Sequence, residues 1–266
     1  MMMIILLLFC FHFMREPCCH ANLFFTYPPF FGTISASTDS DALARRLWEG
    51  AVPDIMQSFS VVSSEVLLRA RAECLLAPLG VLFELNTVAD CMADPVIRPF
   101  FGRCLQKELM PRMDEEGRDE AVIAACRYLS FQPTSLRVND LMDGALESFR
   151  LYLLPLIGKD TPCLTLCLCA LIMLLAGVRR GENGYTLVGS DGSPVPLTRD
   201  EEGLVSFSRL SCDMDAESLA YAALADERIW GRDLREEEGL EDRCARFLQD
   251  IQLLGLSETV QRTAAL

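Results

Sequence analysis

Residues 162–177 read PCLTLCLCALIMLLAG, and this run decides the fold because it is apolar on every face. Thr161 followed by Pro162 is typical of a helix start, since proline is tolerated at the first helical position. The 15 residues after the proline would extend about 22 Å as a helix, which is short of the roughly 30 Å hydrocarbon core of a bilayer. We therefore predict a central buried helix around which the rest of the chain packs.

Helical periodicity continues on both sides of this run. It predicts helices near 64–77, 118–130, 215–225, 240–254 and 257–264, together with one long amphipathic helix over 136–154. Asp94 followed by Pro95 predicts the start of a further helix that continues to Pro111. Three further helix starts are expected, with Asp215 and Ser257 as N-caps and Thr198 with Glu201 as a capping box.

One short segment has the pattern of strands. Tyr185–Val188 and Val195–Leu197 flank the turn-rich sequence GSDGSP, which predicts a β-hairpin near 185–197. The predicted fold is therefore mainly α, a multi-helix bundle-like domain with one short β-hairpin and no Rossmann domain. We place this helical domain at residues 41–266, after an irregular or apolar N-terminal segment at residues 1–40.

The net charge and the apolar N-terminal segment limit the kinds of partner that we expect. The formal net charge is -14, and such an acidic chain repels nucleic acid and anionic lipid, so we expect neither nucleic acid nor a membrane as a partner. Residues 1–14 are apolar, but this run is shorter than the roughly 20 residues of a membrane span and has no basic residue before it. An irregular start is predicted, with a signal peptide or anchor as the alternative.

The 12 cysteines do not form an obvious disulfide framework. Those of the central run behave as small hydrophobic side chains, and most others fall singly in helical segments. This usage favours a reducing compartment, so the cytoplasm is the predicted location. The N-terminal segment holds a second group whose spacing matches no usual zinc motif, and we predict no metal ligands among its members: Cys10, His12, Cys18, Cys19 and His20.

Residues for proton chemistry are scarce. Past position 20 the chain has no histidine and only two lysines, Lys107 and Lys159, which we expect on the surface. It has no GxGxxG, no phosphate-binding P-loop and no HExxH, paired CxxC or GxSxG motif. The acidic runs at 114–120 and 235–242 are typical of solvated helix faces. We therefore predict no catalytic, cofactor-binding or metal residues.

Three stretches together resemble one known family, and they are DERIWGRDLREEEGLEDRCARFLQDIQLLGL (226–256), LTLCLCALIMLLAGVRRGENGYTLVGSDG (164–192) and LLAPLGVLFELNTVADCMADPVIRPFF (75–101). Their order and spacing are similar to those of tagaturonate reductases (altronate oxidoreductases), within the wider mannitol and polyol dehydrogenases. The resemblance covers roughly residues 60–260. It implies that this chain corresponds to the family's helical C-terminal substrate domain. In that family the domain follows a nucleotide-binding domain that holds NAD, and the two domains enclose the active site.

The chain departs from the family where the resemblance places catalysis. The family's catalytic lysine, asparagine and histidine fall at Glu65, Ala70 and Glu73, and a second lysine falls at Ser148. The family lysine acts as a general base on a sugar hydroxyl and, when protonated, polarises the carbonyl during reduction. Glu65 can accept a proton, but at neutral pH it cannot supply a cationic donor.

Three functions are compatible with this pattern. The leading hypothesis is a divergent, truncated relative of tagaturonate reductase that is inactive alone and binds no cofactor by itself. The first alternative is an oxidoreductase completed by a separate nucleotide-binding chain, with NAD and a sugar acid as the family's ligands. The second is a helical protein-interaction module, for which a partner chain or a homo-oligomer is expected.

Overall fold

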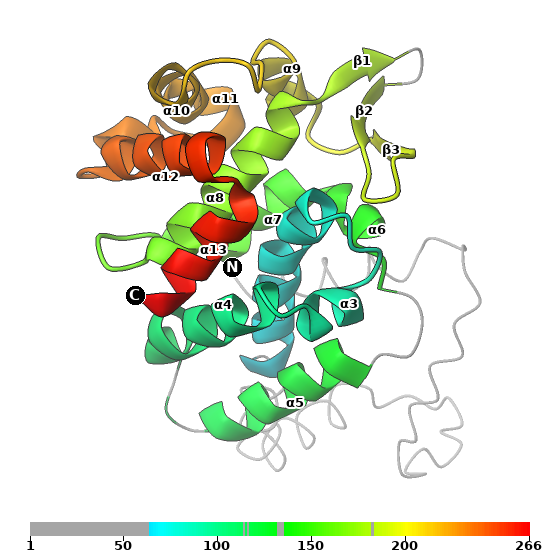
Figure 1. The fold of residues 1–266 in the computed structure, drawn as a ribbon, viewed down its shortest axis with the longest axis vertical. Coiled ribbons are helices and arrows are strands. Elements are labelled where there is room, and N and C mark those ends of the chain that lie inside the picture. The colour runs from blue at the N-terminus through cyan, green and yellow to red at the C-terminus, as the bar shows by residue number, and fades with distance from the viewer. Residues whose placement is uncertain (1–63, 114, 116, 132–135, 182–183) are drawn as a thin grey trace, which may run out of the picture. The chain divides into compact units, whose positions relative to one another are not determined.

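A computed structural model describes residues 64–113, 115, 117–131, 136–181 and 184–266. These residues form a mainly helical domain with one small sheet (Figure 1), as predicted. The boundary proposed at residue 40, the apolar run at the start and the N-terminal cysteine and histidine group lie outside the described residues. Those predictions therefore stay predictions.

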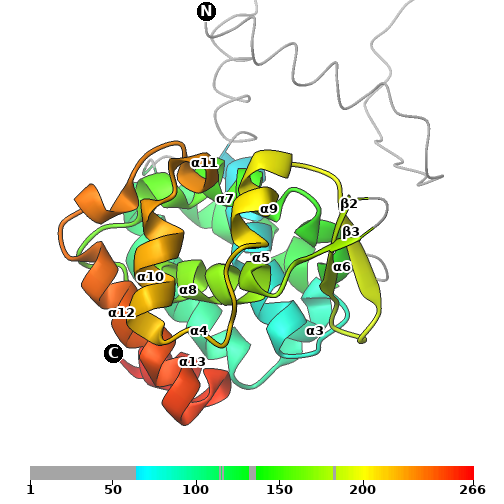
Figure 2. The ribbon, with the colours of Figure 1, turned by 90° about the horizontal axis from the view of Figure 1, so that it is seen from above.

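The apolar run forms the central helix α8 (Pro162–Ala176), which is buried along nearly its whole length. Figure 2 shows it in the middle of the described residues, and four helices pack against it: α4 (Ile97–Cys104), α9 (Glu201–Phe207), α12 (Leu240–Leu254) and α13 (Leu256–Ala265). The prediction of a buried helix is confirmed. Among the residues that the structure describes, no helix has both the length and the apolar character that crossing a membrane requires.

The first part of the domain is built from consecutive helices. Residues 64–82 are helical, and α3 (Val88–Ala93), α4 and α5 (Arg118–Phe131) follow. Asp94 Oδ1 accepts hydrogen bonds from the backbone nitrogens of Val96 and Ile97, at 2.9 and 2.8 Å. A helix does start here, but α4 begins at Ile97 after Val96, two residues later than the predicted first position at Pro95. Beyond α4 the backbone widens into a π-helix, η1 (Leu105–Leu109), and then tightens into the 3₁₀ turn η2 (Met110–Arg112).

The long helix predicted over 136–154 is wrong. The chain instead forms α6 (Val138–Met142), α7 (Ala145–Tyr152) and the 3₁₀ turn η3 (Leu154–Leu156). The break lies at Gly144, whose φ of +93° belongs to the left-handed region that glycine adopts without steric cost. Apolar periodicity on both sides of the break hid it, because two short helices can share one hydrophobic face.

The predicted hairpin is present and has a third strand. β1 (Arg179–Gly181), β2 (Gly184–Val188) and β3 (Pro194–Leu197) form an antiparallel sheet in the order β1-β2-β3. Tyr185 pairs with Leu197 and Leu187 with Val195, and these four side chains are buried on one face while their neighbours are more exposed. This alternation is expected of a sheet with one face against the core.

The C-terminal third consists of short helices that wrap around α8. After α9 come α10 (Ala216–Ala225), α11 (Glu227–Trp230), the 3₁₀ turn η4 (Leu234–Glu236), α12 and α13. Asp215 caps α10 by accepting from the backbone nitrogen of Ser218, as predicted. Two other expected caps are wrong, because α9 follows Asp200 and α13 follows Gly255, neither with a side-chain cap.

Trp230 joins three of these segments. Its ring stands edge-on to Phe149 of α7, with centroids 6.4 Å apart, and to Phe207 of α9, with centroids 6.2 Å apart. Its indole nitrogen donates a hydrogen bond to the carbonyl oxygen of Ala223 at 2.7 Å. The indole is therefore both packed and hydrogen-bonded, which a buried tryptophan requires.

Candidate functional site

The four positions that the resemblance assigns to catalysis lie in one region. Glu65, Ala70 and Glu73 lie on the helix over residues 64–82, and Ser148 lies on α7. Ser148 lies close enough to the Cys74 thiol to influence its acidity, so α7 approaches the residue next to Glu73. The structure thus gathers the four positions around residues 65–74.

Arg69 is the cation of this region. It forms an ion pair and a hydrogen bond with Glu65, one helical turn earlier, and its guanidinium carbon lies 4.1 Å from the centroid of the Tyr128 ring on α5. Stacking of a guanidinium on an aromatic face is favourable and holds the group in place. The region therefore carries a fixed positive charge where the family resemblance predicts a lysine nearby.

Burial changes the acidity of two groups beside Arg69. It raises the pKa of the Glu73 carboxyl, and the positive charge of Arg69 partly opposes that shift. Burial also raises the pKa of the Tyr128 phenol, and the charge of Glu73 adds to the effect. Glu73 is therefore a better proton acceptor than an exposed glutamate, whereas Tyr128 keeps its proton at neutral pH.

Cys74 lies next to these groups but is not a nucleophile. Burial, followed by the charge of Glu73, raises the pKa of the Cys74 thiol to about 12, although hydrogen bonding with Ser148 works in the other direction. A thiol attacks as the thiolate, which is scarce at neutral pH when the pKa is this high. Cys74 is therefore a packing residue in this region.

The arrangement can accept a proton but lacks a matching cationic acid. Glu73 offers a base, while an arginine guanidinium is in general too weak an acid to act as the proton donor. Carbonyl reduction needs a donor to the developing alkoxide. The chain's two later lysines are placed elsewhere: Lys107 is exposed on η1, and the Lys159 ammonium lies 2.6 Å from Glu238 Oε2 on the surface, as expected of ordinary surface lysines.

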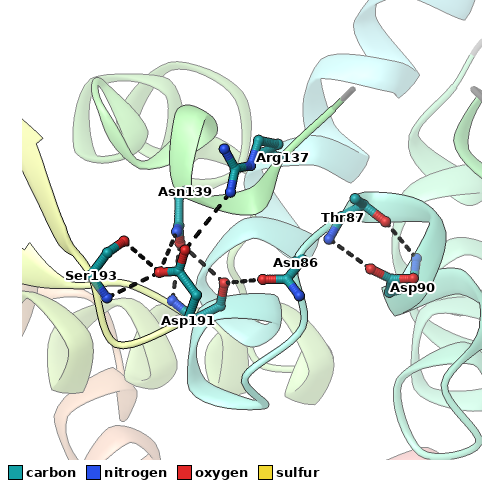
Figure 3. A network of polar contacts seen from close by, with 8 residues as sticks. Asn86, Thr87, Asp90, Arg137, Asn139, Asp191 and Ser193 are labelled. Carbon is teal, nitrogen blue, oxygen red and sulfur yellow. Dashed lines mark hydrogen bonds and ion pairs between the residues drawn. The ribbon is translucent and has the colours of Figure 1, made fainter. Parts of the chain in front are cut away.

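A second polar region, which the sequence did not reveal, lies where the β2–β3 turn meets α6 (Figure 3). The buried Asn139 accepts a hydrogen bond from the backbone nitrogen of Ser190 at 3.0 Å and donates one to Asp191 Oδ1 at 3.3 Å. Asp191 also accepts hydrogen bonds from the hydroxyl and the backbone nitrogen of Ser193, and these two bonds lower the pKa of its carboxyl. Arg137 approaches the same carboxylate at 3.8 Å.

Two further carboxylates hold the other end of the sheet. Asp143, between α6 and α7, accepts hydrogen bonds from the backbone nitrogens of Thr198 and Arg199. Asp200, just before α9, pairs with Arg150 of α7. The sheet is thus attached to α6 and α7 at both ends, and α7 also carries Ser148 of the candidate site. These polar contacts fix the sheet against α6 and α7. None of the side chains that make them is arranged as a nucleophile with a base.

Comparison with known proteins agrees with the resemblance seen in the sequence. Altronate oxidoreductase of Cronobacter sakazakii is 30% identical over 208 residues, which is 71% of this chain and 40% of that protein. The chain is homologous to altronate oxidoreductase. The Klebsiella pneumoniae and Bacillus subtilis altronate oxidoreductases are 28% and 23% identical over 210 and 200 residues. No model of a protein family matches the chain.

The fold has a counterpart among solved structures. Pseudomonas fluorescens mannitol 2-dehydrogenase, solved as a ternary complex with NAD and D-mannitol, superposes with a TM-score of 0.55 at 15% identity. The superposition covers 76% of this altronate oxidoreductase homologue and 40% of the dehydrogenase. The chain likewise spans about 40% of the length of the curated relatives it matches.

The described residues of this altronate oxidoreductase homologue contain no Rossmann cradle for a dinucleotide. A Rossmann cradle needs parallel strands and a glycine-rich turn that opens a helix. The sheet among the described residues has three antiparallel strands, and the sequence has no GxGxxG. We therefore derive no chemical step through NAD from these residues.

Proposed function

We propose that this chain is an altronate oxidoreductase homologue that does not reduce or oxidise sugar acids by itself. The observation that carries the proposal is the replacement of the family's lysine and histidine positions by Glu65 and Glu73, grouped around Arg69. A reversible conversion between hydroxyl and carbonyl needs a general base and a general acid. Two carboxylates and a guanidinium supply the base but no cationic acid that gives up its proton near neutral pH.

A turnover assay on the purified full chain tests this proposal. The chain is mixed with NADH and tagaturonate, and NADH consumption is followed beside the Bacillus subtilis altronate oxidoreductase as a positive control. We expect no consumption above the protein-free rate. Turnover that disappears in Glu73→Gln but persists in Glu147→Gln, an exposed glutamate of α7, would overturn the proposal and make Glu73 the base.

Cofactor binding is a separate measurement. Calorimetric titration of the chain with NAD is expected to show no saturable heat, because the described residues lack a dinucleotide cradle. Saturable binding in the micromolar range would favour the enzyme hypothesis even if tagaturonate were the wrong substrate.

A second candidate is completion by another polypeptide that carries a nucleotide-binding domain. It is favoured by large apolar side chains that are more than half exposed on the three elements of the candidate site, namely Val66 (56%), Ile123 (51%) and Leu151 (57%). Contiguous exposed apolar patches are typical of surfaces that bind a partner, and we propose that these three side chains belong to one such patch. The same surface also suits a helical interaction module that keeps the fold for assembly.

Reconstitution distinguishes these possibilities. The chain is mixed with the isolated nucleotide-binding half of an altronate oxidoreductase, and the mass of the complex is measured by light scattering. Val66→Glu should abolish a complex formed at the candidate site, whereas Val188→Glu, on the exposed face of β2, should not. A complex with NAD-dependent turnover supports completion, a complex without NAD binding supports an assembly module, and failure to associate removes the completion hypothesis.

A further inference from the structure

A buried group of sulfur and carboxylate ligands lies at the start of α8. Cys104 Sγ, Cys163 Sγ and one carboxylate oxygen of Glu108 all lie within 4.8 Å of one another. The exposed fractions of Cys104 and Cys163 are 0%, and that of Glu108 is 1%. A carboxylate this deep in a protein is almost always paired or bound to a metal, because desolvating its charge is costly.

Two pairs with the same spacing build this group. Cys104 and Glu108 are four residues apart across the junction of α4 and η1, and Cys163 and Cys167 are four residues apart on α8. Residues at this spacing face the same side of a helix. Cys167 is also fully buried and lies about one helical turn after Cys163 on the same helix.

The backbone at Glu108 is unusual. Glu108 lies in the five-residue π-helix η1, and single-turn π-helices occur frequently at functional sites. Its two oxygens accept hydrogen bonds from the backbone nitrogens of Cys163 (2.8 Å) and Leu164 (2.9 Å). These bonds fix the orientation of the carboxylate and leave lone pairs on both oxygens, as second-shell contacts do for metal ligands.

We infer that Cys104, Glu108, Cys163 and Cys167 form a closed structural binding site for Zn²⁺. Zinc in structural sites is bound by four tetrahedral ligands, with sulfur at about 2.3 Å, so ligand sulfurs lie about 3.8 Å apart. Three of the four ligand atoms are already within 4.8 Å of one another. These three need only a small contraction, and Cys167, one turn further along α8, supplies the fourth ligand when the ion binds.

The charges favour a thiolate-bound ion at this position. Binding exchanges each thiol proton, released to solvent, for a sulfur–zinc bond, so three thiolates and one carboxylate carry four negative charges against two positive charges. The net anionic complex would lie at the N-terminus of α8, where the helix dipole and the N–H groups of Cys163 and Leu164, which bond to Glu108, stabilise negative charge. Three sulfur ligands select zinc over magnesium and calcium, which bind oxygen.

Cobalt spectroscopy of the reduced full chain tests the site, because tetrahedral Co²⁺ bound to thiolate gives visible d–d bands and a near-ultraviolet sulfur-to-metal band. One equivalent of Co²⁺ should give both, and Zn²⁺ should displace it. We expect Cys104→Ser and Cys163→Ser to weaken Co²⁺ binding more than about tenfold. Cys91→Ser removes an equally buried thiol on α3 and should leave the spectrum unchanged.

The N-terminal cysteines provide the necessary comparison. A variant with Cys10, Cys18 and Cys19 all changed to serine should keep the spectrum. Loss of the spectrum in that variant, or absence of a stoichiometric cobalt signal in the wild-type chain, would overturn the inference. If the Cys104 and Cys163 variants do not fold, X-ray absorption of the zinc-loaded wild type decides, because the site predicts three sulfurs and one oxygen with no imidazole.

Discussion

Asp143 and Thr198, 55 residues apart, are joined by two hydrogen bonds, from the Thr198 backbone nitrogen at 2.8 Å and from its hydroxyl at 2.9 Å. The backbone nitrogen of Arg199 donates a third bond to the same carboxylate. The exit of β3 is thereby attached to the connection between α6 and α7. A carboxylate that had looked like part of a helix instead fixes the position of the sheet.

Asp143→Ala should destabilise the domain. It leaves the N–H groups of Thr198 and Arg199 to water and frees the exit of β3, for an expected loss of about 1–2 kcal/mol in the free energy of unfolding. Urea unfolding followed by circular dichroism measures this loss. Glu147→Ala, an exposed change on α7, is the control and should alter the free energy by less than about 0.5 kcal/mol. Equal losses in the two variants would contradict the role given to Asp143.

Glu108→Ala should be more damaging, because it leaves the N–H groups of Cys163 and Leu164 without an acceptor in the core. Each buried unsatisfied group costs about 1–3 kcal/mol. Glu108→Gln keeps one amide oxygen and should lie between wild type and Glu108→Ala. Unfolding is measured with a chelator present to remove any bound metal, so that the loss of stability reports only the lost cap of α8.

Gln106→Ala is the matched control for Glu108, since Gln106 is exposed on the same π-helix. It should leave stability nearly unchanged. If Glu108→Ala and Gln106→Ala unfolded at the same denaturant concentration, the capping role of Glu108 would be wrong.

Asp226 should make stability depend on pH in the acid range. Hydrogen bonds from Arg228 lower the pKa of its carboxyl to about 2, compared with roughly 3.9 in an unfolded chain. Because the folded pKa is the lower one, this stabilisation is complete above pH of about 4 and is lost as the pH falls toward 2. The contribution is about 1 kcal/mol once solvent screening of a surface pair is considered.

Asp226→Asn should remove that acid-dependent increment. The free energy of unfolding of wild type and variant, measured between pH 2 and 6, should differ at the upper end and converge at the lower end. Glu227→Gln, at the exposed neighbouring position, should leave the wild-type slope in place. A constant difference at every pH would show that Asp226 acts by packing or backbone geometry alone.

Two helical glycines should respond in opposite directions to alanine. A Cβ at Gly80 would lie 2.6 Å from Val138 Cγ1 and 2.8 Å from Cys91 Sγ, whereas a Cβ at Gly102 of α4 meets nothing within 4 Å. Gly80→Ala should therefore cost about 1–3 kcal/mol through overpacking. Gly102→Ala should stabilise by roughly 0.5–1 kcal/mol through lower backbone entropy of the unfolded chain. Thermal and urea unfolding of the pair check the signs.

The sequence predicted correctly those elements that are set by residues close to one another in the chain. Pro162 and the uninterrupted apolar run predicted α8, and the cap Asp215 was correct because its carboxylate accepts from the N–H group three residues later. The hairpin followed from its turn residues and from alternation. The third strand was missed because Arg179–Gly181 is short and exposed, with no buried face to produce a pattern.

Features that depend on contacts between distant residues could not be predicted. Thr198 has the spacing of a capping box, but its hydroxyl is taken by Asp143. Glu108 lies beside a lysine in the sequence and looked like part of a wet face, yet it is buried and caps α8 from 55 residues away. The family positions Glu65, Ala70, Glu73 and Ser148 came from resemblance, and the structure added that Arg69 pairs with Glu65 and acts electrostatically on Glu73.

The enclosure of Trp230 between Phe149 and Phe207 gives the domain a built-in optical probe. The sequence has two tryptophans, and Trp48 lies outside the described residues. In a Trp48→Phe background, all indole emission would come from one ring that α7, α9 and α11 keep dry. A red shift would then report that water has entered between these three helices, before circular dichroism registers any loss of helix.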